Sequence, residues 1–233
     1  MKSIFILCFA MVSCACQTTN PKANTSAIIS TVVTPTAQVI RIPLFILPEP
    51  EYVDVDGFRR LTLYGAVDDM SVNILISALA DKKDVEGFIL EINSGGGSVN
   101  AGFALSKAIE NSSVPVHCFV DGEGMSMAYY ILQSCSTRSM TKRSVLMIHG
   151  PSINGGGDGN SNDWMTIAEL LRAMQNAMIE HCAARMKISP AVLKEKIEVR
   201  SWWINWDEAL KVGAVDYIVD DFKDELKIAK NFR

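Results

Sequence analysis

The sequence lacks the features that mark several large classes of protein. It has no run of basic residues, and its formal net charge is −4 over 233 residues, so a nucleic-acid partner is not expected. It contains only three histidines, and its cysteines show no metal-binding spacing. No Gly-Lys-Ser/Thr sequence follows its glycine-rich stretch, which excludes a Walker A loop. We therefore expect no metal ion and no cofactor.

The cysteines are also too few for a disulfide framework. Cys118, Cys135 and Cys182 remain once the N-terminal region is set aside. In an oxidising compartment Cys118 and Cys135 could pair, but we expect buried free thiols. The composition is 48% hydrophobic, which excludes general disorder and favours one large domain.

Long apolar runs are scarce, and the first one is too short to span a bilayer. One positive charge at Lys2 precedes the apolar residues 3–13, as in a signal peptide. The run ends in Val-Ser-Cys-Ala-Cys, and a small residue followed by cysteine resembles the bacterial lipobox. We expect a lipoprotein signal over 1–13 with Cys14 lipidated, Cys16 being the second choice. The alternative is an ordinary cleaved signal and a soluble periplasmic protein.

The rest of the chain divides in two by composition. Residues 17–37 are rich in Thr, Ser, Asn, Ala and Pro, which is typical of a tether. Residues 38–51 are apolar but interrupted by prolines, which suits an edge strand or an arm. We therefore predict a tether and N-terminal arm over 14–50 and a folded domain over 51–233.

Within that domain, strand and helix patterns alternate. Strands are predicted over 60–65, 87–93, 116–120 and 144–149, with helices from Asp68, over 99–111 and from Ser126 to about 133. Short links between such elements favour a parallel sheet with right-handed crossovers. A polar loop over 152–162 then leads to a long helix over about 163–186.

Three of the strands end in residues that can carry chemistry. Ser94-Gly95-Gly96-Gly97 follows one, Ser126 follows the next and His149 ends another. Active sites of open α/β sheets lie at the carboxyl ends of the strands. Ser126 on a turn into a helix suits a nucleophile, although a serine there is usually only a helix cap. His149 is the best placed of the histidines to act as its base.

These motifs, in this order and spacing, resemble the ClpP family of serine peptidases over about residues 61–219. The matching stretches are residues 88–102, 122–128 and 146–151. The resemblance implies an α/β, ClpP/crotonase-like fold with a mostly parallel sheet, βα repeats and a projecting long helix that builds homo-oligomeric rings. It also implies Ser126 as nucleophile, His149 as base, and the backbone N–H groups of Gly97 and Met127 as an oxyanion hole.

The sequence departs from the family at two positions. The expected third catalytic residue, an aspartate, falls on Ser201, which brings no charge to stabilise an imidazolium. Glu198, Asp207 or Asp158 could substitute, or the enzyme could work as a dyad. The usual proline after Ser94 is Gly95, which should loosen that turn.

The sequence thus predicts an exported, membrane-anchored serine endopeptidase that cuts peptides or unfolded protein segments. Because ATP is absent outside the cytoplasm, we expect it to act without ATP. The alternatives are an inactive scaffold, suggested by Ser201, and a crotonase-type acyl-CoA enzyme. A signal-peptide-peptidase type enzyme with a serine–lysine pair is a further alternative, but Lys107 and Lys142 lie in no motif.

Overall fold

The computed structural model describes residues 30–33, 39–42, 52–153 and 159–232, which divide between two compact units, Met1–Leu47 and Pro48–Arg233. In the first unit, β1 (Ser30–Val33) and β2 (Val39–Ile42) form an antiparallel pair. Both strands fall within residues 14–50, predicted as a tether and N-terminal arm, and β1 lies in the part predicted as a tether. Its run of β-branched residues favours extended structure. Cys14 and the predicted signal lie outside the described residues.

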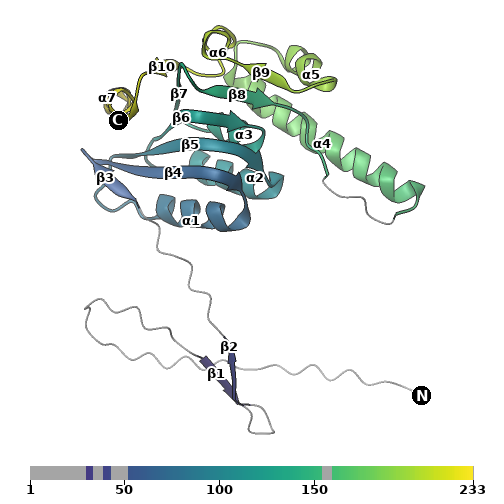
Figure 1. Ribbon diagram of the computed structural model, residues 1–233, viewed down its shortest axis with the longest axis horizontal. Coiled ribbons are helices and arrows are strands. Elements are labelled where there is room, and N and C mark those ends of the chain that lie inside the picture. The colour runs from purple at the N-terminus through teal and green to yellow at the C-terminus, as the bar shows by residue number, and fades with distance from the viewer. Residues whose placement is uncertain (1–29, 34–38, 43–51, 154–158, 233) are drawn as a thin grey trace. The chain divides into compact units, whose positions relative to one another are not determined.

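The second unit is built on an eight-stranded sheet in the order β10-β7-β6-β5-β4-β3, with β8 beside β6 and β9 beside β8 (Figure 1). Only the β3–β4 and β8–β9 pairs are antiparallel. The mostly parallel α/β sheet predicted from the sequence is confirmed. Its strands are β3 (Val53–Val55), β4 (Phe58–Val67), β5 (Gly87–Gly97), β6 (Val116–Met125), β7 (Thr137–Thr141), β8 (Val145–Ile148), β9 (Trp202–Ile204) and β10 (Tyr217–Val219).

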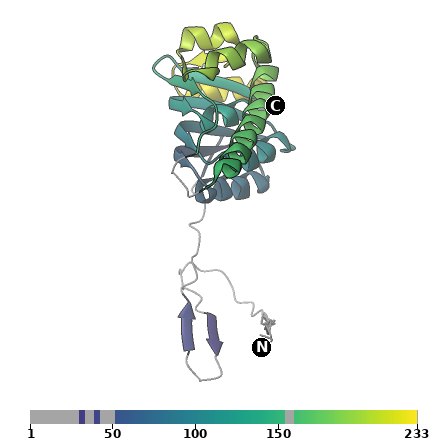
Figure 2. The same ribbon diagram turned by 90° about the vertical axis from the view of Figure 1, so that its right-hand side faces the viewer.

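Helices cover both faces of the sheet, and one projects beyond it (Figures 1 and 2). Helices α1, α2 and α3 lie together on one face, whereas α7 contacts β5, β6 and β10. The helices are α1 (Asp69–Ala80), α2 (Val99–Glu110), α3 (Met127–Leu132), α4 (Ser161–Arg185), α5 (Pro190–Glu198), α6 (Trp206–Val212) and α7 (Phe222–Asn231).

Strand β5 is buried on both of its faces, which places the sheet between two layers of helices. Phe88, Leu90 and Ile92 pack into the larger apolar cluster with α1, α2 and α3. Ile89, pointing to the opposite face, packs with Phe119 and the α7 residue Leu226 in a smaller cluster. A parallel strand buried on both faces reads as a continuous apolar run rather than an alternating one. This explains the unbroken run Phe-Ile-Leu before Glu91.

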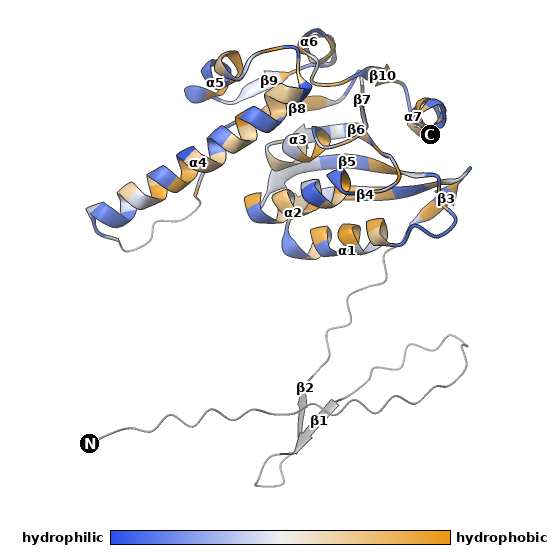
Figure 3. Ribbon diagram, turned by 180° about the vertical axis from the view of Figure 1, so that it is seen from behind, coloured by the Kyte–Doolittle hydropathy of each residue, from blue (hydrophilic) through white to orange (hydrophobic). Residues whose placement is uncertain are grey.

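Helix α4 is the projecting element. Asn160 caps it by accepting from the backbone N–H groups of residues 162 and 163, and Asp163 completes the capping box. Its buried residues lie in its C-terminal half, whereas Trp164, Met165 and Leu170 are 43–63% exposed. Figure 3 shows apolar and polar residues alternating along it. The projecting long helix predicted from the sequence is therefore present.

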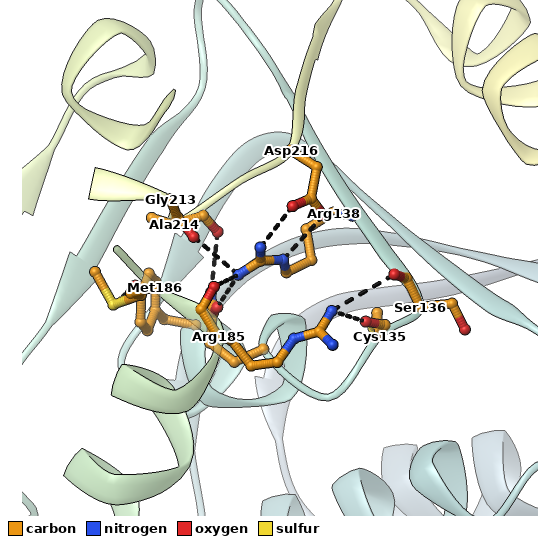
Figure 4. Close-up of polar contacts among 10 residues, drawn as sticks. Cys135, Ser136, Arg138, Arg185, Met186, Gly213, Ala214 and Asp216 are labelled. Atoms are coloured by element: carbon orange, nitrogen blue, oxygen red, sulfur yellow. Dashed lines mark hydrogen bonds and ion pairs between the residues drawn. The ribbon is translucent and has the colours of Figure 1, made fainter. Parts of the chain in front are cut away.

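The C-terminal end of α4 is held by a buried arginine, which the sequence analysis did not single out. Arg138 donates from Nε and Nη2 to the carboxylate of Asp216, at 3.0 and 2.6 Å (Figure 4). Its Nη1 donates to Gln133 Oε1 and to the backbone carbonyls of Arg185 and Gly213. One guanidinium thus joins β7, the end of α3, the end of α4 and the segment before β10.

Several element boundaries differ from the prediction for physical reasons. Strand β7 was missed because residues 137–141 are mostly polar, although all five are buried. Strands β5 and β6 continue beyond the predicted ends at Asn93 and Val120, since they run into the glycine-rich turns. Asn205 caps α6 by accepting from Glu208 N–H at 2.9 Å. The Glu208 carboxylate accepts from the Trp202 indole.

Candidate active site

Three strand ends meet at one cavity of about 310 Å³. The C-terminal halves of β5 and β6 run side by side, with Ser94 paired to Gly124. Beyond the end of β7, β8 takes its place next to β6 and pairs Met125 with Met147. The cavity is lined by Gly95, Gly96, Gly97, Val99, Ser126, Met127, His149, Gly150, Pro151, Ser152 and Met178.

Ser126 occupies a strained turn between β6 and α3. Its φ of 53° and ψ of −117° lie in a region that side chains other than glycine rarely adopt. Its N–H donates to the Met147 carbonyl at 2.7 Å, and its carbonyl accepts from Tyr130 N–H. Ser126 makes no side-chain capping bond to α3. Ser126 therefore occupies the N-cap position of α3 without capping the helix through its side chain, and its hydroxyl is available for another partner.

That partner is His149. The distance from Ser126 Oγ to His149 Nε2 is 2.8 Å, which is hydrogen-bonding reach for a nucleophile and its base. His149 directly follows β8, whose pairing with β6 fixes its position relative to the turn. Both residues are partly exposed at the cavity. The structure thus brings together the two residues that the sequence analysis named as nucleophile and base.

The glycine-rich turn touches the serine turn directly. A Cβ atom built on Gly96 would lie 2.7 Å from Ser126 Cβ and 2.9 Å from Met127 N, closer than side chains tolerate. A Cβ on Gly97 would lie 2.3 Å from the Val67 carbonyl oxygen. Ser94 holds the turn, since its hydroxyl accepts from Gly96 N–H at 3.1 Å and donates to the Gly65 carbonyl at 2.5 Å. Backbone alone fits at these two glycines.

Both predicted oxyanion residues line the cavity beside Ser126. Met127 is the first residue of α3, where a backbone N–H has no partner within the helix. Gly97 ends β5 on the other side of the serine turn. Two backbone N–H groups flanking a nucleophile are the usual means of holding a developing oxyanion.

Helix α4 closes one side of the cavity, which sequence reasoning missed. Met178, 7% exposed, lines it from the inner part of α4. A Cβ on Gly150, next to His149, would lie 2.7 Å from the side-chain oxygen of Gln175. The apolar spacing of α4 near Met178 and Ile179 was the available signal, but periodicity alone does not say which element a helix covers.

The other two histidines are placed elsewhere. His117 is buried in β6, where Nδ1 lies 2.7 Å from Thr137 Oγ1, and burial lowers its pKa to about 4. His181 on α4 stacks on Tyr130 and lies 3.2 Å from Ser134 Oγ. Burial lowers the pKa of His181, partly opposed by Glu110. Neither lines the cavity, so His149 is the only histidine among the cavity residues that the structure describes.

Among the described residues, no acid forms a hydrogen bond with His149 as a third catalytic group. The pairing of β8 with β9 ends with Ile148 against Trp202, and His149 and Ser201 are the next residues on the two strands. Glu198, the last residue of α5, is exposed, and its side chain forms no hydrogen bond among the described residues. Asp207 pairs with Lys211. Asp158 lies outside the described residues. Within the described chain, Nδ1 of His149 has no recorded hydrogen-bond partner.

A disulfide joins Cys118 in β6 to Cys135 after α3. The expectation of free thiols at these positions is therefore wrong, whereas Cys182 is free and buried, as expected. Both linked cysteines are at most 1% exposed. The sequence could not decide between the two states, because the pairing depends on α3 returning the chain to β6. The bond closes a segment that contains Ser126.

Comparison with known proteins agrees with this geometry. The Clp protease family model matches residues 53–222. The chain belongs to the Clp protease family. Among its relatives, the ATP-dependent Clp protease proteolytic subunit 1 of Protochlamydia amoebophila is 30% identical, the match covering 78% of this chain and 90% of the relative. The proteolytic subunit of Streptococcus suis is 29% identical over 71% of this chain and 86% of its own length. Subunit 1 of Chlamydia caviae is 35% identical, over 58% and 72%.

Membership of this family identifies the chain as a peptidase and bears out the resemblance stated from its motifs. In the described part of the chain, no three His, Cys, Asp or Glu side chains gather as a metal site. Among those same residues, no helix is both long and apolar enough to cross a bilayer.

Proposed function

We propose that this Clp-family protein is a serine endopeptidase that hydrolyses peptide bonds in peptides or unfolded protein segments. The observation that carries the proposal is the 2.8 Å contact between Ser126 Oγ and His149 Nε2, made at a strained turn beside a glycine loop. Strain of this kind is retained where the surrounding structure holds a reactive group in place.

The mechanism follows from the positions of these groups. Ser126 Oγ attacks the substrate carbonyl while His149 Nε2 takes its proton. The N–H groups of Gly97 and Met127 stabilise the resulting oxyanion. His149 then gives the proton to the leaving amine, and water releases the acyl group by the reverse sequence. This chemistry needs no metal and no cofactor.

We also propose that the enzyme is exported, anchored through Cys14 and active without ATP, although its relatives are named as ATP-dependent proteolytic subunits. The Cys118–Cys135 disulfide supports export, because disulfides persist mainly in oxidising compartments. Outside the cytoplasm ATP is absent. Incorporation of an alkynyl fatty acid that is lost in Cys14→Ser, and retained in Cys16→Ser, tests the anchor. Labelling that is lost only in Cys16→Ser would place the lipid on Cys16. No labelling of the wild-type protein would refute the lipid anchor.

Assembly into rings is proposed on the exposed apolar residues of α4. Trp164, Met165 and Leu170 are exposed in the N-terminal half of α4, away from its buried residues, and exposed apolar residues gathered in this way usually face a partner. The relatives are named as subunits. Analytical ultracentrifugation tests this, since Leu170→Glu should reduce the assembly to smaller species if α4 joins the subunits.

The alternative functions have less support. The described residues that line the cavity include no carboxylate, whereas a crotonase-type acyl-CoA enzyme would need an acidic pair. A serine–lysine pair is not formed, since Lys107 contacts Glu110 and Lys142 lies over the Trp206 ring. An inactive scaffold would leave the 2.8 Å contact without a role.

Peptide hydrolysis by the purified protein tests the proposal. A blocked fluorogenic peptide and an unfolded protein should both be cut without ATP, and Ser126→Ala should abolish cutting. His149→Ala should lower kcat/KM by at least about 10³-fold. Hydrolysis that persists in Ser126→Ala would refute the assignment, whereas hydrolysis that requires ATP would refute only the ATP independence.

A further inference from the structure

A second cavity lies at the start of β9, at the end of the β8–β9 pair where Trp202 faces Ile148, and the mechanism above does not use it. Its volume is about 640 Å³. It is formed by the end of α5, the start of β9 and α6, and it is lined by Lys196, Arg200, Ser201, Trp202, Trp203 and Glu208. All of these residues lie in the described chain.

The charges around this cavity are unbalanced. Neither Lys196 nor Arg200 has a carboxylate partner among the ion pairs of the described residues. The Lys196 ammonium lies over the Trp202 ring, 5.1 Å from its centroid. The single acid in the lining, Glu208, accepts from the Trp202 indole at 3.2 Å. Two cations at one concave site favour an anion, and an arginine fork fits a carboxylate best.

Strand β9 links this cavity to β8, the strand that His149 directly follows. Leu146 and Ile204, directly paired, are both buried, as are Ile148 and Trp202. Directly opposed residues of an antiparallel pair point to the same face, with Cβ atoms about 4.5–5.5 Å apart. The last pair is Ile148 with Trp202, and His149 and Ser201 are the residues that follow it on the two strands. Continuing the register by one residue sets Ser201, which also lines the cavity, opposite His149.

Within the described chain, His149 has no third group that accepts a hydrogen bond from Nδ1 and orients the imidazole. Its Nε2 contacts Ser126, but no acceptor for Nδ1 is recorded in the described chain. A base is usually oriented by a third group, and a charged acceptor also stabilises the imidazolium. Ser201 can accept a hydrogen bond but carries no charge. An anion held beside Ser201 would provide both the acceptor and the charge.

We propose that the cavity of Lys196, Arg200 and Ser201 binds a carboxylate that completes the catalytic site. The inference rests on the proposed serine peptidase function. Arg200 and Lys196 hold the carboxylate, one of whose oxygens accepts from His149 Nδ1–H. When Nε2 takes the Ser126 proton, the carboxylate stabilises the imidazolium, and the proton on Nδ1 stays there. The carboxylate comes from a substrate's C-terminus or from a free small acid.

Hydrolysis of a blocked, C-terminally amidated peptide by the full-length protein, with added formate or acetate, tests this. At constant ionic strength, kcat/KM should rise saturably by at least about tenfold, whereas chloride should have no effect. Arg200→Gln should raise the half-saturating concentration, and Lys194→Gln, a charge loss on α5 outside the cavity, should not. A free-acid peptide that is cut faster than its amide without added acid would identify the substrate as the source.

Two further measurements separate this inference from the proposed function. Ser201→Asp should raise kcat/KM and remove the response to acetate. In the wild-type protein, acetate should bring out a low-field imidazole proton in the NMR spectrum, and His149→Ala should lack it. A rate that is flat with acetate, while Ser126 still reacts with a fluorophosphonate, would overturn the carboxylate site alone. Absence of fluorophosphonate reaction would instead refute the serine peptidase proposal.

Discussion

Gly96 lies so close to Ser126 that a single methyl group between them would collide with the serine Cβ, at 2.7 Å. The same methyl would lie 2.8 Å from the Met125 carbonyl oxygen, which belongs to the turn backbone. Gly96 also has a φ of +94°, which disfavours any side chain. The glycine-rich turn and the proposed nucleophile are therefore one packed unit.

Gly96→Ala should lower kcat/KM by about 10²-fold or more, because displacement of a reacting group by about 1 Å has that effect. Gly95→Ala is the matched control, since nothing lies within 4 Å of its added Cβ and its φ is unexceptional. Peptide hydrolysis and circular dichroism of the two variants check this. Wild-type activity in a folded Gly96→Ala protein would contradict the described packing.

The sequence was sufficient for the parts of the site that depend on local pattern. Alternating strands and helices placed Ser126 and His149 at neighbouring strand ends, and the structure brings them to 2.8 Å. The sequence was insufficient where a contact joins residues of different elements, because the pattern within one element does not show which other element it packs against. The Cys118–Cys135 bond, Arg138 with Asp216, and Met178 in the cavity wall are of this second kind.

Arg138→Met should lower the free energy of unfolding by about 3 kcal/mol. Removing one member of a buried pair costs about 3–5 kcal/mol, and the partner Asp216 is 33% exposed, which favours the lower end. Urea unfolding measures the change. Lys211→Met, which removes a surface pair with Asp207, should leave the midpoint nearly unchanged. Equal effects of the two substitutions would show that Arg138 does not fix the fold.

Loss of the disulfide in Cys118→Ala/Cys135→Ala should lower the free energy of unfolding by about 3 kcal/mol, as expected for closing a loop of this length. Unfolding curves with and without reductant measure the difference. The bond itself is checked by alkylating the unfolded protein without reductant, which should leave residues 118 and 135 unmodified and modify Cys182. Alkylation of all three thiols would show that the bond is absent and would remove the structural support for export.

Two buried groups in the α7 layer should give opposing pH dependences of stability. Burial raises the pKa of Glu225 to about 7, so stability should fall as pH rises from 4.5 to 7. Burial lowers the pKa of His117 to about 4, so stability should fall as pH decreases from 6.5 to 4. Each contributes up to about 3 kcal/mol, and the two trends offset each other in the wild-type protein.

Single variants separate these contributions. Glu225→Gln should leave a free energy of unfolding that increases with pH between about 4 and 6.5, as set by His117. His117→Leu should leave one that decreases between about 4.5 and 7, as set by Glu225. Urea unfolding at a series of pH values measures both. Parallel pH profiles in the two variants and the wild type would show that neither group titrates differently on folding.

The pairing of Ser126 with His149 is tested most directly by covalent labelling with a fluorophosphonate, followed by peptide mass spectrometry. The folded wild-type protein should carry one adduct, on Ser126, because the 2.8 Å contact with His149 makes that hydroxyl nucleophilic. His149→Ala should slow the reaction by at least about 10²-fold, and Ser126→Ala should abolish it. A folded wild-type protein with no adduct at Ser126 would contradict the assignment of this site as a serine peptidase centre.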